Sequence, residues 1–217
     1  MIKVVIFDLD DTLISELEYI KSGFKVVSEE ISLEHDLDKN ECYLKMIELF
    51  NLNSNNVFNR ILDFYNISYK QKDVHRLVDI YRNHIPEIRL YDDVMPTIKK
   101  LKEKNIKLGI ITDGYKETQN NKIKVLELKR YIDKIIVTDE LGRDFWKPHP
   151  KSYKIMKDYF NVKYEEMIYI GDNESKDFIS PEKLGMKWLK IFRKNSIYNE
   201  NSKKSDITSL STILDLI

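Results

Sequence analysis

Carboxylates gather where the first apolar run of the chain ends. Residues 2–7 form that run, and Asp8, Asp10 and Asp11 follow within four positions. A short apolar run that stops at a polar break is typical of a buried strand in a parallel sheet. Two carboxylates about 4 Å apart repel each other by roughly 4 kcal/mol at an effective dielectric constant near 20, so the group needs a proton, a cation or open water. The pattern also fits a strand that ends in a polar turn, with Asp11 or Thr12 as a cap.

Further polar residues follow later apolar runs or lie in a loop before a helix. They are Thr112 with Asp113 and Gly114, Lys147, and Asp172. The carboxyl ends of parallel strands lie at one edge of a sheet, where open α/β sheets bind their ligands. We therefore expect these residues to converge in space with Asp8 and Asp10.

The chemistry that suits this set is phosphoryl transfer through an aspartyl-phosphate. A divalent cation held by Asp8, Asp172 and one further oxygen would relieve the repulsion between carboxylates, and oxygen ligands suit Mg²⁺. One carboxylate can attack phosphorus. A second carboxylate can protonate the leaving alkoxide and later deprotonate the attacking water.

Hydrogen-bond donors and positive charge for a phosphate would come from the other two segments. The Thr112 hydroxyl and the amides of Asp113 and Gly114, at a helix start, would hold phosphate oxygens. Lys147 would offset the negative charge that spreads in the transition state.

The elements that must position these residues change character along the chain. Residues 15–87 carry apolar residues at helical spacing and predict about four helices without a strand, as in a small helical bundle. The remainder alternates, with helices expected over 92–104, 115–130, 152–160 and 177–184, and strands over 106–112, 135–138, 167–170 and 186–192. Such alternation implies right-handed βαβ units and a parallel sheet. Residues 193–205, rich in Lys and Asn, predict a mobile connection.

The expected fold is therefore α/β. Its Rossmann-like parallel-sheet core, flanked by helices, comprises residues 1–14 and 88–217, and residues 15–87 form an inserted α-helical domain.

The composition limits which binding partners and which cellular compartment are expected. The 217 residues are 42% hydrophobic, and 36 basic residues balance 36 acidic ones, so there is no global attraction to a nucleic acid polymer or an anionic membrane. No apolar run approaches 18 residues, and Asp8 interrupts the one candidate for a signal sequence. The single cysteine, Cys42, cannot form an internal disulfide and reads as a buried small hydrophobe. We expect a cytoplasmic monomer or weak homodimer with a small-molecule phosphate ester as its partner.

Four segments together resemble the motifs of the haloacid dehalogenase superfamily in their usual order. They are residues 8–13, Thr112, Lys147 with Pro148, and residues 171–173 followed by Asp177. The resemblance implies that Asp8 is the nucleophile and a Mg²⁺ ligand. It implies that Asp10 is the general acid and base and gives the metal its backbone carbonyl, and that Asp172 is the third protein ligand. Asp177 would orient Lys147 or a metal-bound water. The inserted helices stand where the superfamily places a helical cap of the C1 type.

The motifs also bear on the reaction and the substrate. Family dehalogenases usually lack the second aspartate of the first motif, so Asp10 favours a phosphatase or phosphomutase. The Thr112 segment, with Gln119 and Lys122, is similar to the nucleotidase and acylneuraminate-phosphatase branch, which more often has Asn where this chain has Asp113. The cap would select the substrate, and Arg60, just after the polar break at residues 51–56, is a candidate for binding a substrate anion.

We thus expect a Mg²⁺-dependent phosphomonoester hydrolase that acts on a small phosphorylated metabolite, a nucleotide or a sugar phosphate, through an aspartyl-phosphate. Two alternatives remain open: a phosphomutase of the same superfamily, and a non-catalytic protein that binds phosphometabolites.

Overall fold

The computed structural model describes residues 1–194, 196 and 206–217. The chain divides into two compact units, one of residues 1–17 with 88–217 and one of residues 18–87. Within the predicted mobile connection, residues 195 and 197–205 lie outside the described residues. In the described part of the chain, the helices are too short or too polar to cross a membrane.

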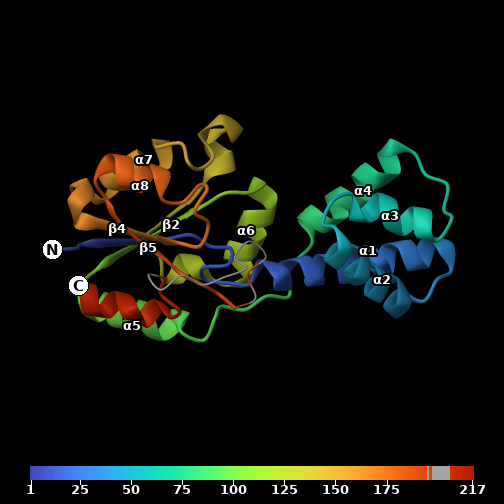
Figure 1. Cartoon of the computed structure of the whole chain (residues 1–217), viewed down its shortest axis with the longest axis horizontal. Helices are drawn as coiled ribbons and strands as arrows, with labels where there is room; N and C mark the ends of the chain where they lie inside the picture. Colours follow the sequence, from blue (N-terminus) through green and yellow to red (C-terminus); the bar gives the residue numbers. More distant parts are fainter. Residues whose placement is uncertain (195, 197–205) are drawn as a thin grey trace. The chain divides into compact units, whose positions relative to one another are not determined.

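The first unit is built on a five-stranded parallel sheet, which confirms the predicted α/β core (Figure 1). The strands lie in the order β3-β2-β1-β4-β5. Their bounds are β1 (Val4–Phe7), β2 (Lys107–Thr112), β3 (Lys134–Val137), β4 (Met167–Gly171) and β5 (Lys187–Lys190). In the register of the sheet, Phe7 of the central strand lies opposite Ile110 of β2 and Ile170 of β4. The carboxyl ends of three adjacent strands therefore lie at one edge, where Asp8, Thr112 and Asp172 stand.

Helices cover both faces of this sheet. Their bounds are α5 (Val94–Glu103), α6 (Lys116–Val125), α7 (Lys151–Phe160), α8 (Ile179–Leu184) and the C-terminal 3₁₀ helix η5 (Leu210–Leu216). One core joins Val5 and Phe7 of β1 to residues of α5, α6 and η5. The other joins Val4 and Ile6 to Tyr153 and residues around α8. Figure 1 shows α7 and α8 on one face of the sheet, and α5 beside the red C-terminal helix on the other. Both faces of β1 are thus buried, which explains its unbroken apolar sequence.

The helix expected over residues 115–130 is shorter in the structure. It ends at Val125, because Glu127 adopts a left-handed conformation with φ of 51°, and a 3₁₀ turn, η1 (Leu128–Arg130), follows. The leucine Leu128 is fully buried. The chain therefore turns here to bury Leu128 in the core, which a continuous helical pattern could not reveal.

The second unit is helical, as predicted, and α1 starts two residues before it. Its helices are α1 (Glu16–His35), α2 (Lys39–Leu52), α3 (Val57–Phe64) and α4 (Gln71–Asn83). The ring of Phe24 packs edge to face against Phe50 and Phe58, at centroid distances of 5.7 and 6.1 Å. Cys42 is buried, as predicted, and burial raises the pKa of its thiol to about 11. A thiol in that state is a packing group rather than a nucleophile.

Candidate active site

Asp8 stands one residue beyond β1 and is buried. Its backbone N–H donates to the carbonyl of Ile170 at 2.8 Å, which continues the pairing of β1 with β4 past Phe7. Only 3% of the residue is exposed. The sheet therefore holds Asp8 at a fixed place on the edge where the strands end.

Lys147 binds Asp8 from a loop far along the chain. The Nζ atom lies 2.8 Å from Oδ1 of Asp8, 2.7 Å from Oδ1 of Asp177 and 3.0 Å from the hydroxyl of Tyr169. Burial favours the neutral amine, but the carboxylates of Asp177 and Asp8 outweigh it and raise the pKa of Lys147 well above its usual value. The three acceptors match the three N–H bonds of an ammonium, so the cation is held in one orientation.

Asp113 positions the loop that carries Lys147. Its Oδ1 atom accepts a hydrogen bond from the Thr138 hydroxyl at 2.6 Å and another from the backbone N–H of Lys147 at 3.1 Å. The Asp113 side chain therefore accepts hydrogen bonds from within the protein, and the amide oxygen of an asparagine could accept the same two bonds. Gly114 has φ of 130°, a conformation that favours glycine. Whether the two amides of Asp113 and Gly114 bind phosphate remains a prediction.

Three buried carboxylates lie close enough together to hold a cation. One oxygen from each of Asp8, Asp172 and Asp177 lies within 4.8 Å of the others. Burial, together with Asp8 and Asp177, raises the pKa of Asp172 to about 8. Burial likewise raises the pKa of Asp8 to about 6, although Lys147 opposes the rise. This buried oxygen cluster, short of positive charge, fits a hard divalent cation.

Both carboxylate oxygens of Asp177 have hydrogen-bond partners. Besides Lys147 and Tyr169 at Oδ1, the backbone N–H of Asn173 donates to Oδ2 at 2.9 Å. A Cβ atom at Gly171 would lie 2.4 Å from that Oδ2 atom. Glycine is thus required for Asp177 to approach the strand end, in addition to any need for a tight turn. These contacts support the implied role of Asp177 in orienting Lys147.

The Asp10 side chain lies outside that carboxylate cluster and is held by helix α6. Gln119 Nε2 donates to its Oδ2 atom at 2.9 Å, and Lys122 Nζ donates to its Oδ1 atom at 2.7 Å. Gln119 also donates to the Thr112 hydroxyl. Burial and the Asp10 carboxylate raise the pKa of Glu16, the first residue of α1, to about 8. The side chain of Asp10 is therefore bound from α6, whereas that of Asp8 is bound by Lys147.

Sequence reasoning linked Gln119 and Lys122 only to a branch of the family and did not give them a contact. A usable signal was present, since two polar residues three positions apart share one face of a helix. That face is buried, with Gln119 1% and Lys122 3% exposed. Tyr169 was also missed, although a tyrosine within a buried strand usually needs a polar partner for its hydroxyl.

Arg193 holds the turn that follows Asp10. Its Nε and Nη2 atoms donate to the carbonyl of Thr12 at 3.1 and 2.8 Å, and its guanidinium also binds both carboxylate oxygens of Asp93, at 2.9 and 3.0 Å. Asp11, in the same turn, has φ of 48° and accepts from the backbone N–H of Glu16 at 2.9 Å. Asp11 thus caps the start of α1, which agrees with the cap role that the sequence allowed for it.

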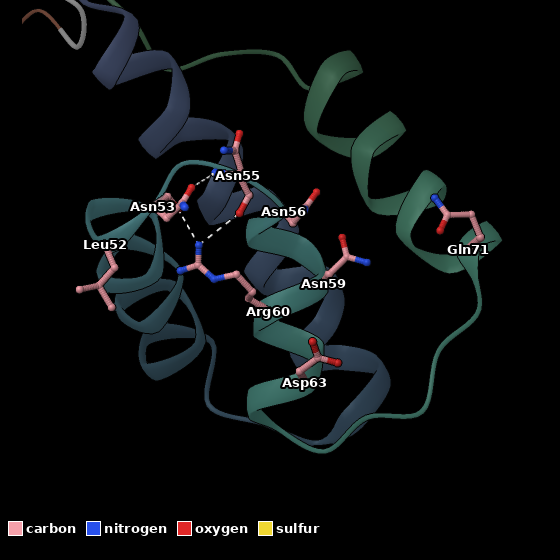
Figure 2. Close-up of a pocket in the computed structure, with 8 residues that line it drawn as sticks. All are labelled: Leu52, Asn53, Asn55, Asn56, Asn59, Arg60, Asp63 and Gln71. Atoms are coloured by element: carbon pink, nitrogen blue, oxygen red, sulfur yellow. Dashed lines mark hydrogen bonds between the residues drawn. The ribbon is translucent and has the colours of Figure 1, made fainter.

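Arg60 has a local partner set in the second unit (Figure 2). Its Nη1 atom donates to the carbonyls of Asn53 and Asn55 at 2.7 and 3.2 Å, and Nη2 donates to the carbonyl of Leu49. The guanidinium therefore binds the end of α2 and the polar break that follows it. Binding of a substrate anion by Arg60 remains a prediction. Such an anion would bind the same guanidinium that holds these three carbonyls.

Comparison with known proteins shows the family to which this sequence is similar. Residues 5–191 match the sequence model described as haloacid dehalogenase-like hydrolase. A glyceraldehyde 3-phosphate phosphatase of Pyrococcus furiosus is 31% identical over 226 residues, which cover 100% of this chain and 93% of that protein. The pyrophosphatase PpaX of Bacillus mycoides is 25% identical over 195 residues, covering 88% of this chain and 83% of that one.

A solved structure has the same fold. The crystal structure of a phosphatase of this family from Thermococcus onnurineus aligns with a TM-score of 0.65 and 24% identity, over 99% of this chain and 97% of that one. The range matched by the family model includes Asp8, Lys147 and Asp177.

Proposed function

The chain belongs to the haloacid dehalogenase-like hydrolases, and we propose that it is a Mg²⁺-dependent phosphatase that hydrolyses small phosphomonoesters through an aspartyl-phosphate (acyl phosphate) on Asp8. The observation that carries this proposal is the ammonium of Lys147, which bridges Oδ1 of Asp8 and Oδ1 of Asp177 inside a cluster of buried carboxylates. A buried carboxylate with a fixed cation on one oxygen is oriented for attack by the other.

The proposed reaction has two steps. In the first, an oxygen of Asp8 attacks phosphorus, the P–O bond to the alcohol breaks, and the carboxyl of Asp10 gives its proton to the leaving oxygen. In the second, Asp10 takes a proton from a water molecule that attacks phosphorus, which releases inorganic phosphate and restores Asp8. Lys147 offsets the negative charge on the phosphoryl oxygens in both steps. The Thr112 hydroxyl would donate to a phosphate oxygen.

The residues present fit a magnesium ion. Asp8 and Asp172 would hold it through their carboxylates and Asp10 through its backbone carbonyl, while Asp177 is engaged with Lys147. When bound, Mg²⁺ would neutralise the phosphate dianion and favour the ionised state of the carboxylates. Burial and the neighbouring carboxylates of Asp8 and Asp177 raise the pKa of Asp172 to about 8, and a bound cation would oppose that rise.

We propose that the helical unit, residues 18–87, is a cap that selects the substrate. The relative from Pyrococcus furiosus acts, by its name, on glyceraldehyde 3-phosphate, and this sugar phosphate of three carbons is our leading candidate. Cytoplasmic location and a monomer or weak homodimer remain predictions of the sequence.

The test is a panel of phosphate compounds assayed for release of inorganic phosphate, with Mg²⁺ and with excess EDTA. The panel contains glyceraldehyde 3-phosphate, a hexose phosphate, a nucleoside monophosphate and pyrophosphate. We expect turnover of at least one small ester that EDTA abolishes and Asp8→Asn removes. Near wild-type turnover by Asp8→Asn would overturn the assignment of the nucleophile, and an isomerised sugar phosphate in place of free phosphate would favour a phosphomutase.

A further inference from the structure

We propose that Lys122 and Gln119 are positioning residues that hold the carboxylate of Asp10 for proton transfer. The inference rests on the proposed function and deepens it, because it assigns the surroundings of the general acid. Neither residue is expected to touch the reacting atoms. Their effect would pass entirely through Asp10.

Both oxygens of Asp10 are bound from one helix face. Oδ1 accepts from Lys122 Nζ at 2.7 Å, and Oδ2 accepts from Gln119 Nε2 at 2.9 Å. Two donors on two different oxygens fix the plane of a carboxylate as well as its position. A single contact would leave the group free to rotate about its last bond.

The burial of the two donors indicates a built arrangement rather than a surface contact. The side chain of Lys122 is 3% exposed, whereas that of Asp10 is 19% exposed. An ammonium is costly to bury unless it is paired, so α6 would not carry a lysine on its buried face without a carboxylate there to meet it. The carboxylate is thus the more accessible member of the pair, as a group that must reach a substrate has to be.

The two aspartates of the first motif consequently have separate cations. Lys147 binds Asp8, and Lys122 binds Asp10. The separation suits two different tasks, because the nucleophile must stay ionised whereas the acid must first give up a proton and then take one. Lys122 holds the Asp10 carboxylate in one place, with its Nζ atom 2.7 Å from Oδ1.

Gln119 adds a connection to the phosphate end of the site. Its amide nitrogen donates both to Asp10 and to the hydroxyl of Thr112, the last residue of β2. Helix α6 follows that strand after three residues, so a short segment fixes the spacing between Thr112 and Gln119. A phosphate bound at Thr112 and the proton donor for its leaving group would therefore be held in register by one side chain.

The experiment compares kcat/KM for two esters whose leaving groups differ in their need for a proton. Glycerol phosphate loses an alkoxide and needs the acid, whereas p-nitrophenyl phosphate loses a stable phenolate and does not. General acid catalysis contributes on the order of 10² to 10⁴ in rate. For Lys122→Met and Gln119→Ala we expect kcat/KM to fall by about 100-fold with the alkyl ester and by less than about tenfold with the aryl ester. Lys122→Arg, which keeps a charged donor, should recover part of the loss.

Lys124→Met, an exposed lysine on the same helix, is the matched control and should change neither value. Equal falls for both esters in the Lys122 and Gln119 variants, or no fall for either, would overturn the inference. If Lys122→Met does not fold, judged by circular dichroism, the ratio measured for Gln119→Ala decides. The proposed function fails separately, when the wild type hydrolyses neither ester or when Asp8→Asn stays active.

Discussion

The Nζ atom of Lys147 lies 2.7 Å from Oδ1 of Asp177, and the side chains of both residues are fully buried. The pair joins the loop before α7 to the segment after β4, thirty positions apart. An ion pair in such a place costs desolvation energy that its attraction must offset. Its clearest use here is to hold the ammonium against Asp8, since Lys147 contacts Asp8 and Asp177 through the same atom.

Burial of this ion pair predicts that its loss costs much more stability than the loss of an exposed ion pair. Asp177→Ala leaves the ammonium with one carboxylate fewer in a buried place, and we expect the free energy of unfolding to fall by about 3–5 kcal/mol. Urea unfolding followed by circular dichroism measures the change. Arg130→Ala, which removes an exposed partner of Glu127, is the control and should cost less than about 1 kcal/mol. Similar costs for the two variants would contradict the importance of burial at Lys147.

The carboxylate cluster predicts that Mg²⁺ binding depends on pH. The pKa of Asp172 is raised to about 8 and that of Asp8 to about 6, chiefly by burial. Because Mg²⁺ binds the ionised groups, its affinity should rise from pH 6 to about pH 8 and then level off. At pH 7 the Asp172 carboxyl is mostly protonated, so binding should release about one proton.

Isothermal titration calorimetry in two buffers of different ionisation enthalpy measures the released protons directly. Asp172→Asn should remove most of the release and weaken binding. Affinity that stays constant between pH 6 and pH 8 would show that these carboxylates are not the ligands.

The close approach of Asp177 to Gly171 predicts that substitutions at these two positions have strongly coupled effects on stability. Gly171→Ala places a Cβ atom 2.4 Å from Oδ2 of Asp177, a distance that forces the carboxylate to move. We expect a loss of about 1–3 kcal/mol in stability and a large loss of phosphatase activity, because Asp177 orients Lys147. In an Asp177→Ala background, the same glycine substitution should cost much less stability, since the clashing group is gone. Additive losses in this double-mutant cycle would place the cause elsewhere.

The contacts of Arg60 allow its role in stability to be tested separately from a role in substrate binding. Arg60→Ala removes donors to the carbonyls of Leu49, Asn53 and Asn55, and we expect unfolding to become easier by about 1–3 kcal/mol. If the residue also binds a substrate anion, KM should rise while kcat stays the same. Asn59→Ala, from the same polar region in Figure 2, is the matched control. An unchanged KM in a folded Arg60→Ala protein would disprove the predicted substrate contact.

Local patterns in the sequence were enough for the elements of the core. Apolar runs such as that before Asp8 predicted the strands, and the parallel pairing placed Asp8, Thr112 and Asp172 at one edge, where the structure has them. Helical spacing predicted the second unit. These predictions succeeded because strand and helix periodicity depend on neighbouring residues. The break near Glu127 escaped because burial of Leu128 decided it.

The sequence by itself thus determined the fold class, the element order and the residue types available for catalysis. The tertiary structure decided which of them meet. Asp10 and its two donors on α6 are separated by 109 and 112 positions, and no local pattern reports a contact over that distance. The inward orientation of Asp113 and the second need for glycine at Gly171 were decided in the same way. The physical reason is that hydrogen bonds and ion pairs between buried side chains depend on packing of whole elements, which the sheet and its helices must complete first.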